Sequence, residues 1–111
     1  MATRPPIETA RQRFEALLAT LQQKQPDLVP DRLRSVFDRV AVLYKNKQHW
    51  TGESLIDHCL GVLKEFVAFA PDEDSITACL IHHLLLDDGE GGWTLEEIEK
   101  AFGKEAAGIL S

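Results

Sequence analysis

Apolar residues recur at intervals of three and four along most of this chain, and this periodicity limits what the chain can fold into. Side chains at that spacing share one face of an α-helix, whereas a half-buried β-strand alternates at every second residue. No strand-like alternation, internal repeat or low-complexity stretch interrupts the pattern. The sequence therefore predicts an all-α fold, a compact bundle of five to six helices.

Breaks in the periodicity divide the chain into the expected helices. Prolines separate the first two, because proline lacks an amide donor, and we expect Asp31 to cap the second. Thr94 and Glu97 have the spacing of a capping box for the fifth helix, and Gly103 is expected to end it in a left-handed conformation. The expected ranges are about 7–24, 31–44, 54–70, 75–86, 94–102 and 104–111.

Length and apolar content indicate one domain over residues 1–111. Helix 75–86 is apolar nearly all round, so it should be the central, most buried element. Cys59 and Cys79 lie within apolar helical patterns without C-x-x-C spacing, which favours core residues over a disulfide or metal clasp. The short segment 104–111 has an apolar face that needs cover. This face predicts a homodimer or an adjacent domain, and the chain is either naturally short or a piece of a longer one.

The net charge of −6 is unevenly distributed. Residues 1–70 carry 10 basic and 8 acidic side chains, whereas residues 71–111 carry 2 basic and 10 acidic ones. An acidic half repels phosphate-rich partners, so we expect no nucleic-acid binding. No apolar run approaches the roughly 20 residues that span a bilayer, and the N-terminus lacks a signal peptide. We therefore expect a cytoplasmic protein with no membrane partner.

Four histidines are the candidate chemical groups: His49, His58, His82 and His83. Adjacent helical positions point about 100° apart, so His82 and His83 are expected to face different points. His83 and Asp87 are four positions apart and would share a helix face. Imidazole and carboxylate suit Zn, Mn or Fe, which makes this pair half of a metal site. The alternative is a histidine hydrogen-bonded within the core.

Three motifs in order give the chain a family resemblance. Residues 51–58, TGESLIDH, look like the S-G-E-P-Y-I-x-H-P element of RelA/SpoT alarmone hydrolases. Residues 75–83, SITACLIHH, resemble that family's T-I-x-A-A-L-L-H-D helix, and residues 94–103, TLEEIEKAFG, resemble its T-L-x-x-I-x-x-x-F-G stretch. The resemblance covers about two-thirds of the chain and implies an HD-type helical hydrolase domain.

The resemblance also implies a metal site, usually for manganese. In the family the HD pair, an upstream histidine and a downstream aspartate bind the metal, and a Glu-Asp pair helps the bound water attack a 3′-pyrophosphate. In this chain the HD histidine is kept as His82, but His83 replaces the HD aspartate. The other substitutions are Tyr44 for the upstream histidine, Leu86 for the glutamate of the Glu-Asp pair, Ser111 for the downstream aspartate, and Cys59 for the proline after His58; the aspartate of the Glu-Asp pair survives as Asp87.

One retained ligand does not make a catalytic metal site, which keeps about three protein ligands and an open position. We therefore expect a catalytically degenerate HD domain, with no cofactor and no catalytic residue, that regulates, binds or assembles. The resemblance relates it to (p)ppGpp metabolism, as the N-terminal part of an alarmone synthetase if the chain is a fragment. His58 and Tyr44 are the expected binding residues for a nucleotide ligand.

Two alternatives remain open at this point. The first is a working manganese-dependent phosphohydrolase acting on (p)ppGpp or another nucleotide. It would use His58, His82, His83 and Asp87 with Asp88, and its helix would have to unwind near Asp87. The second is a structural helical domain that dimerises through its short last helix.

Overall fold

A computed structural model of the protein describes residues 6–45, 47–48, 52–84 and 92–110. Within these ranges the chain forms six α-helices and no β-strand, apart from an isolated bridge between Gln48 and Ser54. The all-α prediction is confirmed. The helices are α1 (Pro6–Lys24), α2 (Pro30–Leu43), α3 (Leu55–Phe66), α4 (Glu73–Ile81), α5 (Leu95–Phe102) and α6 (Lys104–Leu110), with 3₁₀ turns η1 (Val67–Phe69) and η2 (His82–Leu84).

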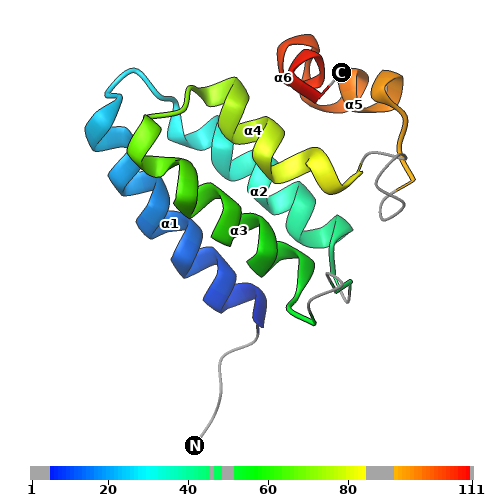
Figure 1. The fold of residues 1–111 in the computed structure, drawn as a ribbon, viewed down its shortest axis with the longest axis horizontal. Coiled ribbons are helices and arrows are strands. Elements are labelled where there is room, and N and C mark those ends of the chain that lie inside the picture. Colours follow the sequence, from blue (N-terminus) through cyan, green and yellow to red (C-terminus); the bar gives the residue numbers. More distant parts are fainter. Residues whose placement is uncertain (1–5, 46, 49–51, 85–91, 111) are drawn as a thin grey trace, which may run out of the picture.

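Helices α1 to α4 lie side by side, and α5 and α6 form a pair at one edge of this layer (Figure 1). Helix α4 packs against α2, α3 and α6, so it contacts more neighbouring helices than α1 does. Its buried residues are Ile76, Thr77, Ala78, Leu80 and Ile81. The prediction that this helix is the central element is confirmed, because an element covered on several sides needs an apolar surface nearly all round.

Aromatic and aliphatic side chains from every helix make one continuous core. Phe14 of α1 stacks on Phe37 of α2 with ring centroids 4.5 Å apart. Cys59 is fully buried, Cys79 is partly buried against the core, and both thiols are free. The interpretation as a core residue is confirmed for Cys59, whereas Cys79 lies at the edge of the core. No helix in the described ranges combines the length and apolarity needed to cross a membrane.

The start of α2 differs from the prediction. Val29, not Asp31, is the N-cap residue, and Pro30 occupies the first turn. Proline suits this position because its fixed φ is already helical and its missing N–H would be unpaired there anyway. Asp31 instead lies in the first turn and accepts a hydrogen bond from Arg34 at 3.1 Å. The prediction of Asp31 as the cap was wrong.

Two helices end earlier than the periodicity predicts. Helix α3 ends at Phe66 rather than at residue 70, and the chain then makes the 3₁₀ turn η1 and a left-handed residue, Ala70, at φ 48°. Helix α4 ends at Ile81 rather than at residue 86, and η2 follows it. Apolar residues continue past the end of each α-helix into η1 and η2. The apolar pattern alone therefore does not reveal where the α-helix changes to a 3₁₀ turn.

The capping box of α5 is present as predicted. Thr94 accepts a hydrogen bond from the amide of Glu97, and Glu97 accepts one from the amide of Thr94 at 3.1 Å. Gly103 ends α5, but its angles of φ 105° and ψ 154° lie outside the left-handed helical region. Only glycine adopts this extended conformation with positive φ easily, and it lets α6 begin at the next residue.

Candidate functional site

Three imidazole rings gather where α4 passes into η2. The rings of His82 and His83 have centroids 3.9 Å apart, and the ring of His58, from α3, lies 5.1 Å from that of His83. The expectation that His82 and His83 would diverge was therefore wrong for their rings. Their Cα–Cβ bonds diverge, but rotation about χ1 and χ2 brings neighbouring rings together.

The two adjacent histidines nevertheless have different surroundings. His83 is 8% exposed and belongs to the interior. His82 lines a surface groove, and its Nδ1 lies 3.0 Å from the carbonyl oxygen of Cys79. Because a carbonyl oxygen only accepts, Nδ1 of His82 carries the proton and donates. Its Nε2 is then the one ring nitrogen that a ligand can use.

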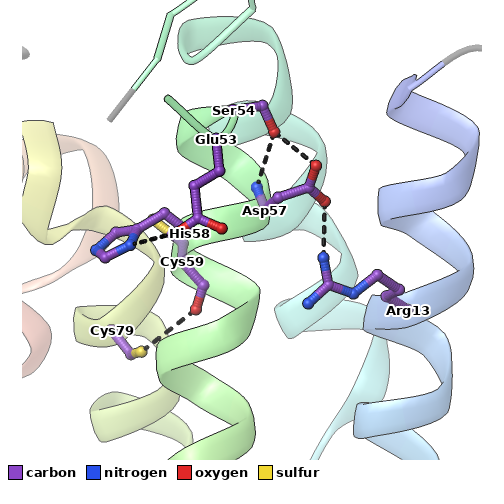
Figure 2. Close-up of polar contacts among 7 residues, drawn as sticks. All are labelled: Arg13, Glu53, Ser54, Asp57, His58, Cys59 and Cys79. Atoms are coloured by element: carbon purple, nitrogen blue, oxygen red, sulfur yellow. Dashed lines mark hydrogen bonds and ion pairs between the residues drawn. The ribbon is translucent and has the colours of Figure 1, made fainter. Parts of the chain in front are cut away.

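Polar contacts hold His58 from the first turn of α3 (Figure 2). The Nδ1 of His58 donates to the carboxylate of Glu53 at 3.0 Å. On the other side of the helix, Ser54 caps α3 by accepting from the amide of Asp57, and it also donates to the Asp57 carboxylate at 2.7 Å. Arg13 of α1 binds the same carboxylate at 2.8 Å. This chain of contacts fixes the end of α3 that carries His58.

Tyr44 is buried beside the histidines and serves the fold. Its hydroxyl donates to the carbonyl oxygen of Leu80 at 2.8 Å, which joins the end of α2 to α4. Burial raises the pKa of the Tyr44 hydroxyl well above its ordinary value of 10.0. The hydroxyl therefore stays protonated and is engaged as a donor. A protonated phenol of this kind is a poor metal ligand.

The donors of the described residues do not fit the catalytic metal that the resemblance implies. No group of three or more His, Cys, Asp or Glu side chains among residues 6–45, 47–48, 52–84 and 92–110 is arranged to hold an ion. The proposed pairing of His83 with Asp87 relied on a continuous α-helix, and the α-helix ends at Ile81. The candidates His49, Leu86, Asp87, Asp88 and Ser111 lie outside the described residues.

Comparison with known protein families gives a match that covers about two-thirds of the chain. A family model described as HD domain matches residues 37–111. The chain belongs to the HD-domain family. This fold is of the metal-dependent phosphohydrolase type. No curated protein and no solved structure matches the chain.

Arginines in the more basic part of the chain, residues 1–70, pair with acids or with an aromatic ring. Four arginines each contact a carboxylate. The pairs are Arg11 with Asp38, Arg13 with Asp57, Arg32 with Glu73, and Arg34 with Glu15. Arg39 lies over the ring of Phe102, 4.3 Å from its centroid. These five guanidinium groups therefore connect helices of the bundle.

A surface groove near His82 was missed by sequence reasoning. It has a volume of about 520 Å³ and lies where α3, α4 and α6 meet. The one signal in the sequence is the apolar face of residues 104–111, of which Ile109 and Leu110 line the groove. That signal predicts a face in need of cover but not a groove, because the packing of three separate helices makes the groove.

Proposed function

We propose that this HD domain is catalytically degenerate and has a regulatory, binding or assembly role related to alarmone metabolism. The observation that carries the proposal is the state of Tyr44, which stands where the resemblance to RelA/SpoT hydrolases places a histidine ligand. Its hydroxyl is engaged with the carbonyl of Leu80 at 2.8 Å and is buried. If the chain is part of a longer one, the resemblance makes it the N-terminal part of an alarmone synthetase.

The described ligand positions support this reading. A catalytic centre of this type needs about three protein ligands and an open position for water. Of the positions that the resemblance assigns within the described residues, His82 keeps its residue, whereas Tyr44 and His83 do not. The change to His83 replaces an anionic carboxylate by an imidazole in the interior, and carboxylate is the ligand type that suits manganese.

One observation favours the alternative of a working phosphohydrolase with a rearranged site. The rings of His58, His82 and His83 are neighbours, at centroid distances of 5.1 and 3.9 Å. Imidazole is a good ligand for Fe and Zn. In this alternative Asp87 and Asp88 would complete the site and handle protons.

A manganese titration by calorimetry separates the two. We expect no binding up to millimolar metal, because no three donors among the described residues are arranged to hold an ion. A dissociation constant below about 10 µM, roughly −7 kcal/mol, would refute the degenerate site, provided that His82→Ala abolishes the binding. Purified protein is analysed for bound metal in parallel.

The alarmone part of the proposal has its own test. Incubation with ppGpp, with and without manganese, should leave the nucleotide intact, while calorimetry should detect binding that His58→Ala weakens about tenfold. GDP, which lacks the 3′-pyrophosphate, is the matched control ligand. Absence of ppGpp binding at millimolar concentration would contradict a role in alarmone metabolism but would not bear on the degenerate site.

A further inference from the structure

The groove beside His82 has a floor and two walls. Helix α4 forms the floor, α3 forms one wall, and α6 forms the other. Its lining is almost entirely apolar, with Ser75 and His82 as its polar side chains. The lining residues are Val62, Leu63 and Phe66 from α3, Pro71, Ser75, Ala78, Cys79 and His82 along the floor, and Ile109 and Leu110 from α6.

The length of the floor matches two turns of a helix. Ser75 and His82 both line the groove and are seven positions apart, which corresponds to about 10 Å along the helix axis. A helix that lies along the groove presents residues i, i+3 or i+4, and i+7 over the same distance. The groove therefore has room for the apolar stripe of one short amphipathic helix.

The tops of the two walls are large apolar side chains that remain about half exposed. Phe66 on α3 is 49% exposed, and Ile109 on α6 is 51% exposed. Both side chains line the groove, Phe66 from α3 and Ile109 from α6. Covering such side chains gains roughly 25 cal/mol for every Å² removed from water. Phenylalanine is one of the aromatic residues that are enriched in protein interfaces.

The charged residues nearest to the lining are acidic on all three helices. On each of the three helices one exposed acid is the charged residue nearest to the face that lines the groove. Counted around the helix axis at 100° per residue, its angle from the centre of that face is about 90–105°. These acids are Glu65 on α3, Asp74 on α4 and Glu105 on α6. Lys64 and Lys104 lie on the opposite sides of α3 and α6 by the same step. The groove is thus apolar inside, and the charged side chains that follow its lining face most closely on each helix are acidic.

We propose that this groove binds an amphipathic helix of another protein, whose apolar stripe is flanked by lysine or arginine. Charge complementarity selects this partner, because basic flanks meet Glu65, Asp74 and Glu105 while the apolar stripe covers Phe66 and Ile109. The acidic edges disfavour a phosphate-bearing ligand in the groove. The proposal goes beyond the proposed function, since it requires neither a metal nor ppGpp at the histidine cluster.

The test is a titration of the HD domain with a monomeric helical peptide that has a leucine stripe and lysine flanks. The same peptide with glutamate in place of lysine is the matched control. We expect the lysine peptide to bind at least about tenfold more tightly than the glutamate peptide, and added salt to weaken the lysine peptide's binding. Amide NMR shifts should map to α3, α4 and α6.

Two substitutions identify the surface. Phe66→Ser and Glu65→Lys should each weaken binding of the lysine peptide by about fivefold or more. Their matched controls are Val42→Ser and Asp27→Lys, at exposed positions on other surfaces, which should leave binding unchanged. His58→Ala should also leave it unchanged, so that failure at the histidine cluster and failure at the groove are distinguished.

Equal binding of both peptides, or binding that Phe66→Ser does not weaken, would overturn the proposal. Absence of binding at millimolar peptide would overturn it as well. Sedimentation equilibrium tests whether a second copy of this chain occupies the groove instead. A mass that doubles with concentration in the wild type but not in Phe66→Ser would assign the groove to a second copy of this chain, and this result too would overturn the proposal.

Discussion

The hydroxyl group of Tyr44 takes part in a structural hydrogen bond at a position where the resemblance expects a metal ligand. A histidine at this position would present a ring nitrogen to a metal, whereas the tyrosine hydroxyl donates to the carbonyl of Leu80 and joins α2 to α4. A net gain of about 1 kcal/mol is typical for such a hydrogen bond. The residue therefore contributes to stability at a position where the resemblance expects a ligand.

Asp72 gives a testable pH dependence at the scale of one residue. Its carboxylate accepts hydrogen bonds from the side chain and the amide of Ser75 at the start of α4, and these bonds lower the pKa of Asp72 below 3.8. A carboxyl group whose pKa is lower in the folded state stabilises the fold above pH 3.8, and this contribution is lost as the pH falls through the folded pKa.

Asp72→Asn isolates the effect, because asparagine still caps a helix but does not titrate. Urea unfolding of both proteins between about pH 2 and pH 6 gives two stability profiles. The wild type should exceed the variant by a constant amount at the upper end, and the difference should shrink below pH 3.8. A difference that grows as the pH falls would refute the assignment. Ser75→Ala should reduce the effect.

At the scale of elements, α4 is the helix on which the arrangement depends. It contacts α2, α3 and α6, and the η2 turn at its end carries His82 and His83. The amide of Trp93 donates to the carbonyl of Leu84 at 2.7 Å, so the chain returns to the end of this turn before α5 begins. Contacts of α4 with its neighbours and the hydrogen bond at Leu84 together fix the position of His82 and His83.

Leu80→Ala tests the central role of α4. Leu80 is fully buried, so its truncation should lower the free energy of unfolding by about 2–5 kcal/mol through lost burial and a residual cavity. Val42→Ala, at a side chain 69% exposed on α2, is the control and should change stability by less than about 0.5 kcal/mol. Urea unfolding measures both. A loss below about 1 kcal/mol for Leu80→Ala would contradict the burial of this helix.

At the scale of the whole molecule, the thiols report on how the core opens. Cys59 lies inside the core, and burial raises the pKa of its thiol. Cys79 lines the groove, and burial raises the pKa of its thiol to about 11 from 9.0. Because the thiolate is the reactive form, both groups should be protected while the protein is folded.

Labelling with a thiol reagent at about pH 8 measures this protection. Native Cys79 should react about a hundredfold more slowly than in the denatured chain, as expected for a thiol pKa of about 11 instead of 9.0. Cys59 should react only as fast as the whole domain unfolds, and Cys79→Ser allows it to be followed alone. Rapid labelling of Cys59 in the native state would show that the core opens locally between α3 and α4.

The sequence by itself determined the helices, because the spacing of apolar residues fixes which face of each helix is buried. It also determined the central place of the most apolar helix and the capping box of Thr94 and Glu97, since both depend on residues near one another in the chain. The motifs in residues 51–103 indicate the HD domain, which the family match at residues 37–111 shows.

Only the tertiary structure decided how the site residues meet. Periodicity did not reveal that α4 gives way to a 3₁₀ turn at His82, nor that the rings of His82 and His83 come together, because the spacing of apolar residues fixes neither the end of a helix nor a side-chain rotamer. The hydrogen bond of Tyr44 to Leu80 joins residues 36 positions apart. The groove beside His82 likewise exists only where three separate helices meet, and local sequence does not encode such a contact.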